Sequence, residues 1–417
     1  MKAGAGKSEI SLPEDYLKIE DFAVVHRTLN ARAIVLESDS VMVFLSLELT
    51  SVPDEEAFEI RKMIGEKFHI EESHIWVCVT HTFSTPHFWS DSVLKEKSRI
   101  ESKGEFRDEL QKASLKAVEK AFSQLQPASI GIGTDYSLVN CNRDIRLEDG
   151  WWVGTNGAGL SDHQVNIIRI DNEKGIPLAV IFHYAIQSSV LQGSVLSAGG
   201  RAVTPDVAGI ACDYIEKNMG NPELVALFLI GASGDQAPVE KAVNETFIRG
   251  ERIWTDRKEE GFGICEKLGV SLGNTVCNRA GSIVCKEENN KIEFGNVEFL
   301  VPGKEMEPEL KKLHPSKYVE YKASQDKDTA VEVVCLGNIA LVGIKPELNC
   351  GSGVTLQTLS PYPHTLVCTM INGSMKYMAE KASYDRFTYE AMNSPFGKGA
   401  AEILIEESLK LLKKMNI

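Results

Sequence analysis

Apolar runs of strand length that end abruptly in polar turns recur along this sequence. In one of them, the run from His74 to Val79 is followed by a polar turn that contains His81 and His87. A polar side chain at the carboxyl end of a strand lies at the crevice where open α/β sheets place their ligands. The repetition of this arrangement predicts an α/β fold with a ligand site at one edge of its sheet.

Strands are predicted to alternate with helices along the whole chain. A first β-α-β unit is predicted from strands at 30–38 and 41–47, a helix from Pro53 to about Phe68, and a strand at 74–80. Apolar runs predict further strands at 165–170, 178–183, 224–230, 331–336, 339–344 and 365–370. Helical spacing predicts helices at 107–124, 206–219, most of 250–280, and 398–414.

Two segments lack these regular patterns. Residues 140–159 are expected to form a long polar loop, and the charged stretch 303–330 is expected to be an excursion or a linker. The order of strands and helices elsewhere predicts an α/β protein with a mixed β-sheet core flanked by helices. At 417 residues the chain is expected to form a single domain spanning residues 1–417.

Charge balance and hydropathy narrow the classes of partner. With 45 basic and 59 acidic residues, the formal charge is -14, which argues against a surface that binds nucleic acid. No segment approaches the ~18 consecutive apolar residues of a membrane helix, and the amino terminus lacks a signal peptide's apolar core. The nine cysteines are scattered and form no Cys-x-x-Cys pair, which is typical of a reducing compartment. We therefore expect a cytoplasmic protein with a small-molecule substrate, whose oligomeric state the sequence does not indicate.

The residues that follow the predicted strands have side chains that suit a zinc ion. They are His81, His87, His183, Asp235, Glu347 and the segment 372–377, which ends in Tyr377. A catalytic zinc keeps one position for water and lowers the pKa of that water to about 7. Each residue also has an ordinary alternative role, as a hydrogen-bonded histidine, a helix cap, a packing aromatic or a turn residue. Spacing alone leaves both interpretations open, and the absence of a Gly-x-Ser-x-Gly motif disfavours a serine hydrolase.

A series of short motifs runs through nearly the whole chain in a defined order. They are Ala5–Ser11 with Leu29–Val35, Thr80–Pro86, Asn142-Arg143, Phe182-His183, Gly234–Pro238, Leu341–Glu347 and Ser360–Tyr377. In this order they resemble the catalytic domain of the neutral, non-lysosomal ceramidases and their bacterial relatives. The resemblance implies a ceramidase-like fold and a zinc-dependent hydrolase that cleaves an amide bond with metal-activated water.

The same resemblance assigns roles to individual residues. It implies that Zn2+ is bound by His81, His183, Glu347 and Tyr377. It also implies that Asn142 and Arg143 face the substrate, and that Asp235 supports the reaction from beside the metal ligands.

Several positions depart from the family pattern. Phe83 stands where the family has the second histidine of Thr-His-Thr-His, and Ala237 stands where ceramidases can carry serine. Phe83 would then contact the substrate, and His87 either replaces the missing histidine beside the substrate or is a solvated turn residue. The chain also lacks the signal peptide and the carboxyl-terminal β-sandwich domain of secreted ceramidases. We therefore expect a small soluble amide rather than a membrane sphingolipid as substrate.

Two alternatives to an amide hydrolase remain open. Phe83 and Ala237 favour a metal-free binding or regulatory protein that kept the fold and lost the reaction. A zinc enzyme that acts on an ester or lactone, or that catalyses a non-hydrolytic reaction, is also compatible because zinc serves many chemistries as a Lewis acid.

Overall fold

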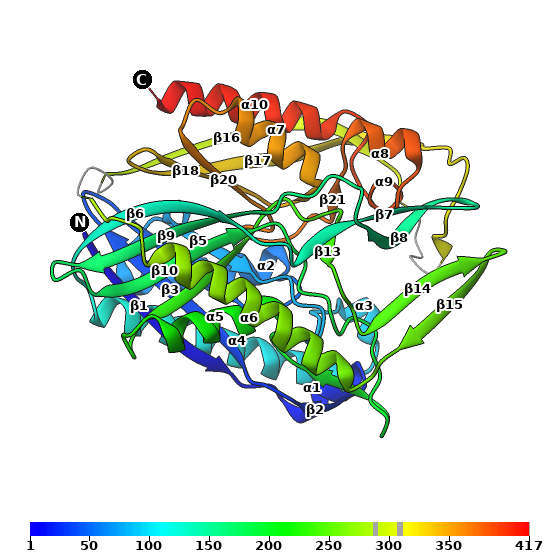
Figure 1. Ribbon diagram of the computed structural model, residues 1–417, viewed down its shortest axis with the longest axis horizontal. Helices are drawn as coiled ribbons and strands as arrows, with labels where there is room; N and C mark the ends of the chain where they lie inside the picture. Colours follow the sequence, from blue (N-terminus) through cyan, green and yellow to red (C-terminus); the bar gives the residue numbers. More distant parts are fainter. Residues whose placement is uncertain (287–290, 307–311, 417) are drawn as a thin grey trace.

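Two β-sheets packed face to face form the centre of the structure, and helices cover the outer face of each sheet (Figure 1). The computed structural model describes residues 1–286, 291–306 and 312–416. The larger sheet has eight strands, in the order β12 (Val225–Ile230), β10 (Pro177–Tyr184), β9 (Gln164–Asn172), β6 (Gln126–Tyr136), β1 (Lys2–Ile10), β3 (Leu29–Glu37), β4 (Val41–Leu47) and β5 (Ile75–Val79). The smaller sheet has the order β16 (Ile292–Lys304), β17 (Ala323–Leu336), β18 (Ile339–Ile344) and β20 (His364–Cys368). The prediction of a mixed sheet core flanked by helices is confirmed, with two sheets in place of one.

The larger sheet is buried on both faces, as the apolar runs of its strands require. In β5, Ile75, Val77 and Val79 lie in the core between this sheet and the helices. Trp76 and Cys78 point the other way, into the core between the two sheets. The helices on the outer face are α2 (Asp54–Phe68), α4 (Lys97–Ser123), α5 (Asp206–Asn218) and α6 (Glu260–Ala280).

The smaller sheet is also buried on both faces. Leu341 lies in the core between the sheets, whereas Val342 faces α7 (Cys350–Leu359) and α10 (Ala400–Met415) on the outside. Leu404 and Leu412 of α10 are fully buried in that outer core. The remaining short elements are α1 (Glu14–Ile19), β2 (Phe22–Val25), η1 (Glu72–His74), α3 (Asp91–Leu94), β11 (Arg201–Val203), β19 (Glu347–Leu348), β21 (Tyr377–Met378), α8 (Lys381–Arg386) and α9 (Tyr389–Met392).

The prediction of a polar loop at 140–159 is wrong. This segment forms the hairpin of β7 (Asn140–Leu147) and β8 (Gly150–Asn156), and β13 (Gln236–Pro238) pairs with β7 on its other side. Backbone hydrogen bonds between segments that are distant in sequence hold this sheet together. Its strands therefore lack the apolar alternation by which a strand is recognised in a sequence.

Two further expectations need correction. The segment 250–280 is helical only from Glu260, because β15 (Glu251–Asp256) pairs with β14 (Val243–Ile248) in a hairpin. Of the expected excursion or linker at 303–330, residues 303–304 end β16 and residues 323–330 begin β17, whereas residues 305–306 and 312–322 form no strand and residues 307–311 lie outside the described residues. The first residues of β17 are largely exposed, which agrees with their charged side chains.

Parallel pairing brings the carboxyl ends of several strands to one region. Within the two large sheets, the parallel pairs are β4 with β5, β10 with β12, and β18 with β20. Loops that follow these strands are joined by backbone hydrogen bonds: the Gly234 N–H donates to the Leu348 carbonyl, and the Thr369 N–H donates to the Ile230 carbonyl. The polar turns of the sequence are thus adjacent in space, as the sheet-edge argument predicts.

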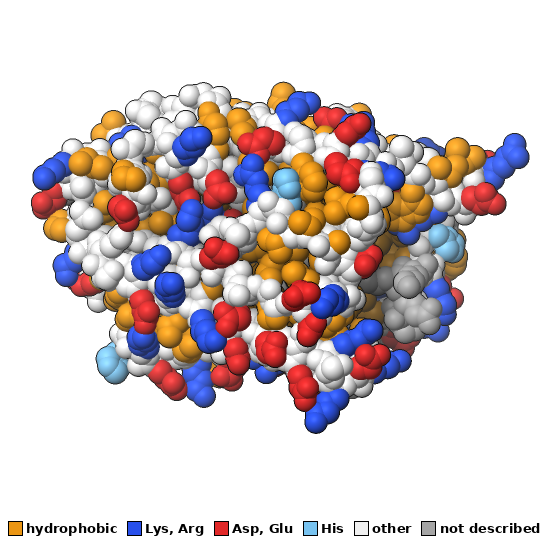
Figure 2. All heavy atoms as spheres, turned by 90° about the horizontal axis from the view of Figure 1, so that it is seen from below, with side chains coloured by type: hydrophobic (Ala, Val, Ile, Leu, Met, Phe, Trp, Pro, Cys, Tyr) orange, Lys and Arg blue, Asp and Glu red, His pale blue; other side chains and the backbone are white. Residues whose placement is uncertain are grey.

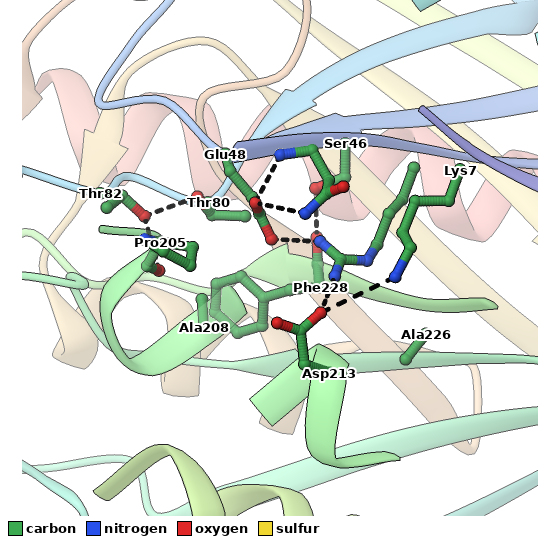
Figure 3. Close-up of polar contacts among 12 residues, drawn as sticks. Lys7, Ser46, Glu48, Thr80, Thr82, Pro205, Ala208, Asp213, Ala226 and Phe228 are labelled. Carbon is green, nitrogen blue, oxygen red and sulfur yellow. Dashed lines mark hydrogen bonds and ion pairs between the residues drawn. The ribbon is translucent and has the colours of Figure 1, made fainter. Parts of the chain in front are cut away.

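A buried network of charged side chains crosses from β3 to α5 (Figure 3). The Arg32 guanidinium contacts Glu48, Asp213 at 2.7 Å and Glu216 at 2.9 Å. Lys7 contacts the other oxygen of Glu216 at 2.5 Å. Glu48 lies in the segment after β4 whose Leu47 and Leu49 carbonyls accept hydrogen bonds from the N–H groups of Thr80 and Thr82, at the start of the turn after β5.

On the face shown in Figure 2, Lys and Arg side chains are intermingled with Asp and Glu side chains around apolar patches. Within the described part of the chain, no helix is both long enough and apolar enough to cross a membrane.

Candidate functional site

His81 lies in the turn that follows β5, and its ring is held from one side. Its backbone is in the left-handed region, with φ of 51°, and its carbonyl accepts a hydrogen bond from the Ser188 N–H at 3.1 Å. The Nδ1 atom is 2.6 Å from the Thr50 carbonyl oxygen, which can only accept a hydrogen bond, so Nδ1 carries the hydrogen and donates. The Nε2 atom is buried, has no hydrogen-bond partner among the described residues, and lies 3.4 Å from Glu347 Oε1.

Glu347 and Tyr377 are neighbours on a short parallel ladder between β19 and β21. Glu347 Oε1 accepts hydrogen bonds from Gln187 Nε2 at 2.7 Å and from the Ser233 hydroxyl at 3.0 Å. Burial alone would raise the pKa of Glu347, but the nearby His81 and Arg143 and the bond from Gln187 hold that pKa below its usual value. Glu347 is therefore an ionised carboxylate in a buried site.

Arg143 on β7 lies against the same group. Its Nε and one terminal nitrogen donate to Glu390 Oε1 at 2.8 and 2.6 Å, and its other terminal nitrogen donates to Gln187 Oε1 at 2.7 Å. The guanidinium carbon is 5.4 Å from the ring centroid of Tyr377 and 5.6 Å from that of Tyr389. Burial raises the pKa of the Tyr377 phenol and outweighs the lowering effect of Arg143, so the phenol is protonated.

Asn142 and Asp235 stabilise the backbone around Arg143 and Glu347. Asn142 Nδ2 donates to Asp235 Oδ2 at 3.0 Å, and the Arg143 N–H donates to the Asp235 carbonyl at 2.8 Å. The Cys350 N–H donates to Asp235 Oδ1 at 2.7 Å. Burial raises the pKa of Asp235 to about 6, although the Cys350 bond acts in the opposite direction. These contacts agree with a supporting role.

The structure does not bring His183 to this group. Its side chain points between the two sheets, where Nε2 is 2.8 Å from the Val367 carbonyl. Among the described residues, no group of three or more His, Cys, Asp and Glu side chains could hold a metal ion, so His183 does not join His81 and Glu347. The physical reason is that β10 continues through His183 to Tyr184, so alternation turns His183 toward the second sheet. Burial lowers the pKa of His183, which keeps its imidazole neutral.

His87 is also placed elsewhere. Its Nδ1 lies 2.7 Å from Glu20 Oε2, and its backbone N–H donates to Glu20 Oε1 at 2.6 Å. Phe83, in contrast, lies at the site, with its ring centroid 4.6 Å from that of His81. Of the two side chains proposed to contact the substrate from this turn, only Phe83 lies beside His81.

A pocket of about 340 Å³ opens beside these residues. Its lining includes Phe83, Arg143, Tyr377 and Tyr389, and the β14–β15 hairpin forms another wall. Larger hollows of about 770 Å³ exist on the surface, but one is lined by the outer side of the charged network and another by residues near the amino terminus. We assign the smaller pocket to the site because its lining includes Phe83, whose ring lies against that of His81, and Tyr377, which is paired with Glu347.

Three site residues were not anticipated from the sequence: Gln187, Ser233 and Glu390. A usable signal existed for Ser233, which lies in the polar turn directly after the strand predicted at 224–230, whereas Tyr184, Ala185 and Ile186 separate Gln187 from the strand predicted at 178–183. His183 was selected in the same region because imidazole is a common metal ligand, but the side chain beside Glu347 is the amide four residues later. Glu390 lies on a short helix near the carboxyl terminus, and its sequence context carries no comparable signal.

Fold and site together define an α/β protein with two stacked sheets and a buried, polar site at the carboxyl ends of parallel strands. Among solved structures, the chain resembles a ceramidase described as complexed with C2, with a TM-score of 0.76 and 15% sequence identity. That similarity covers 100% of this chain and 75% of the ceramidase chain. The neutral ceramidase from Pseudomonas aeruginosa matches with a TM-score of 0.74, 16% identity, and coverage of 99% of this chain and 74% of its own. The chain therefore has the neutral ceramidase fold, as the motifs predict.

Two other comparisons give no match. No protein-family model matches the sequence, and no curated protein matches it. The likeness to the ceramidases thus lies in the fold, and the chemistry of this chain has to be argued from its own residues.

His81, Glu347 and Tyr377 carry nitrogen and oxygen atoms of the kinds that bind a metal ion. His81 Nε2 is buried without a partner while Nδ1 is held by a carbonyl, the arrangement usual for a metal-binding histidine. Glu347 and Tyr377 lie next to each other and supply oxygen donors. Three protein donors with an open position are the pattern of catalytic zinc, although sites of this kind commonly contain more than one imidazole.

Proposed function

We propose that this chain is a hydrolase that cleaves an amide (C–N) bond of a small molecule and depends on zinc held by His81, Glu347 and Tyr377. The observation that carries the proposal is the unpartnered, buried Nε2 atom of His81, which faces the Glu347 carboxylate. A buried nitrogen without a hydrogen bond is costly, so a ligand for it is expected. The neutral ceramidase fold supports a hydrolase as the class of enzyme.

The residues around this set have separate roles in the proposed reaction. A zinc ion bound there would polarise a carbonyl group and lower the pKa of a water molecule. Arg143, which lines the pocket, would stabilise negative charge that develops on the substrate oxygen. Gln187 and Ser233 hold Glu347 in one orientation by donating to the same oxygen. Phe83 and Tyr389 line the pocket and would exclude bulk water from the reacting bond.

Metal analysis of the purified protein tests the ligand assignment. The wild type is expected to contain stoichiometric zinc, and His81→Ala and Glu347→Ala are expected to lose most of it. His87→Ala is the matched control, because His87 is paired with Glu20 and should leave zinc content unchanged. Full zinc retention in both ligand variants would overturn the assignment. Hydrolysis of a panel of amides, esters and lactones then identifies the bond that is cleaved.

A metal-free binding protein is the second candidate, and one observation favours it. Gln187 bridges Glu347 and Arg143 with two hydrogen bonds, so the carboxylate and the guanidinium already have partners without an ion. Purified protein that contains no transition metal and hydrolyses none of the panel compounds would favour this candidate over the enzyme. A cytoplasmic location and a single domain over residues 1–417 stay predictions under either function.

A further inference from the structure

Lys241 is a charged side chain in the same pocket that the proposed reaction does not use. It lies between β13 and β14 and lines the cavity together with Arg143, Phe83 and Tyr377. No described residue forms a hydrogen bond or an ion pair with its ammonium group. The side chain is partly buried, so water solvates the charge only from the side of the pocket.

The other charged side chains that line the pocket all have partners. Arg143 is held by Glu390 through two nitrogens, and Arg252 is paired with Glu245 at 2.6 Å between their terminal atoms. Lys241 is therefore the one charge among the described lining residues that no partner compensates. The pocket has an excess positive charge at that point.

The chemistry around Lys241 makes this charge costly in the absence of a ligand. Burial lowers the pKa of Lys241 to about 8, and the neighbouring Arg143 charge acts in the same direction. Cys141, Asp206 and Glu245 raise the pKa of Lys241, but they do not offset the burial. A bound anion would remove this cost, because it would give the ammonium a charge-assisted hydrogen bond.

The rest of the wall is aromatic. Trp152 and Trp254 line the pocket on the side of the β-hairpins, and Phe83, Tyr377 and Tyr389 line it on the side of His81. A cavity of about 340 Å³ with such walls suits a small ligand with a planar or apolar group. A single unpaired ammonium suits a monoanion such as a carboxylate, whereas phosphate sites generally use several donors or a bidentate arginine.

We infer that this pocket binds small molecules that carry a carboxylate next to an aromatic or apolar group, and that Lys241 receives the carboxylate. As a statement about substrate, the inference rests on the proposed function and narrows it to amides with a free carboxylate. As a statement about binding, it holds for the purified protein whether or not a bond is cleaved.

Binding of matched probes tests the inference without any reaction. The probes are 3-phenylpropanoate, its uncharged amide 3-phenylpropanamide, and phenyl phosphate, titrated into the full chain by calorimetry and followed by the fluorescence of Trp152 and Trp254. The acid is expected to bind about tenfold or more tightly than the amide, which is the ratio typical of one charge-assisted hydrogen bond. Lys241→Met should abolish the preference, and Lys241→Arg should keep most of it.

Several outcomes would overturn the inference. They are equal affinity of the wild type for the acid and the amide, no binding of the acid at millimolar concentration, tighter binding of phenyl phosphate, or an unchanged acid preference in Lys241→Met. Circular dichroism and thermal unfolding of both variants show whether each remains folded. If Lys241→Met is misfolded, Lys241→Arg still tests the inference, because a folded variant that keeps the positive charge should still prefer the acid over the amide.

A comparison of two substrates separates this inference from the proposed function. Hydrolysis of N-acetylphenylalanine is measured beside hydrolysis of its uncharged carboxamide. If neither is cleaved while 3-phenylpropanoate binds through Lys241, the proposed hydrolysis fails and the anion site stands. If both are cleaved at equal rates with no effect of Lys241→Met, the hydrolase stands and the anion site fails.

Discussion

Two clusters of charged side chains differ in how completely they are paired, the network around Arg32 and the site around His81. In the first cluster, Arg32 contacts the carboxylates of Glu48, Asp213 and Glu216, and Lys7 contacts two of these, Asp213 and Glu216. Figure 3 shows the part of this network around Glu48 and Asp213. At the site, His81 Nε2 is buried without a partner and Lys241 has no hydrogen bond. The network satisfies its charges within the fold, whereas the site leaves donors and charges for a ligand. We therefore interpret the first as structural and the second as functional.

The largest expected effect is on stability, in the paired network. Arg32→Met leaves Glu48 buried without its cation, since both side chains are almost fully buried. We expect a loss of about 3–5 kcal/mol in the free energy of unfolding, because one partner of a buried pair remains charged and unpaired. Urea unfolding followed by circular dichroism measures this loss.

The matched control is Lys2→Met, which removes an exposed pair with Glu37 on the neighbouring strand edge. That change should cost less than about 1 kcal/mol. An equally small loss for Arg32→Met would remove the distinction between the two clusters.

The second expected effect has the opposite sign. Lys241→Met removes an ammonium whose pKa is lowered to about 8 from 10.5, so it should stabilise the ligand-free protein by about 1–3 kcal/mol. The folded state binds the Lys241 proton less tightly than the unfolded state does. The advantage of the variant should therefore be complete below pH 8 and should shrink as the pH rises toward 10.5.

Thermal unfolding of both proteins between pH 7 and pH 10 checks this prediction, in buffers without carboxylate ions. The charged groups that face Lys241 are Arg143, Cys141, Asp206 and Glu245, and all are unchanged in the comparison. A variant that is less stable than the wild type at pH 7 would show that the Lys241 charge is stabilised within the fold, like the charges of the Arg32 network.

The third prediction concerns the position of Gln187 between Glu347 and Arg143. Gln187→His would add a second imidazole beside His81 and so strengthen the donor set for zinc. We expect zinc affinity to rise by about tenfold or more, equivalent to about 1.4 kcal/mol. Competition with a chelator measures it. Gln187→Ala is the control, and equal zinc affinity in the two variants would place residue 187 beyond reach of the ion.

The smallest expected effect belongs to His87, which the sequence could not separate from the site. His87→Ala breaks a partly exposed pair with Glu20 and should cost about 0.5–1 kcal/mol. Because His87 and its N–H help to lower the pKa of Glu20, this stability should be lost as the pH falls through the pKa of Glu20. A clear loss of zinc or of ligand affinity in His87→Ala would instead show that His87 contributes to the functional site.

The regular elements that sequence reasoning recovered share one property, which is burial of apolar side chains at a fixed period. β3, β4, β5, β12 and β18 and the helices α2, α5 and α10 lie close to their predicted positions. The hairpin of β7 and β8 was missed because β7 contains polar residues such as Asn142 and Asp144, whose side chains lie near the site and interrupt any apolar pattern. Its strand structure depends on pairing with β13, which lies about ninety residues away.

Within the site, short motifs and tertiary contacts contributed different residues. The motifs indicated His81, Arg143, Glu347 and Tyr377, and the structure brings these four together. His183 was indicated by the same reasoning, yet the residue beside Glu347 is Gln187. One extra residue of strand reverses the face on which a side chain lies, and strand ends are poorly defined in sequence.

By itself, then, the sequence determined the fold class, the repetition of polar residues at strand ends, and most members of the site. Local propensity and apolar periodicity are properties of neighbouring residues, so they can be recognised without coordinates. Tertiary structure alone decided which polar groups are paired and which are not. Pairing is a matter of distances between residues far apart in the chain. Arg32 contacts Glu48, Asp213 and Glu216, whereas neither His81 Nε2 nor the Lys241 ammonium forms a hydrogen bond with another described residue. Those two unpaired groups carry the functional proposals.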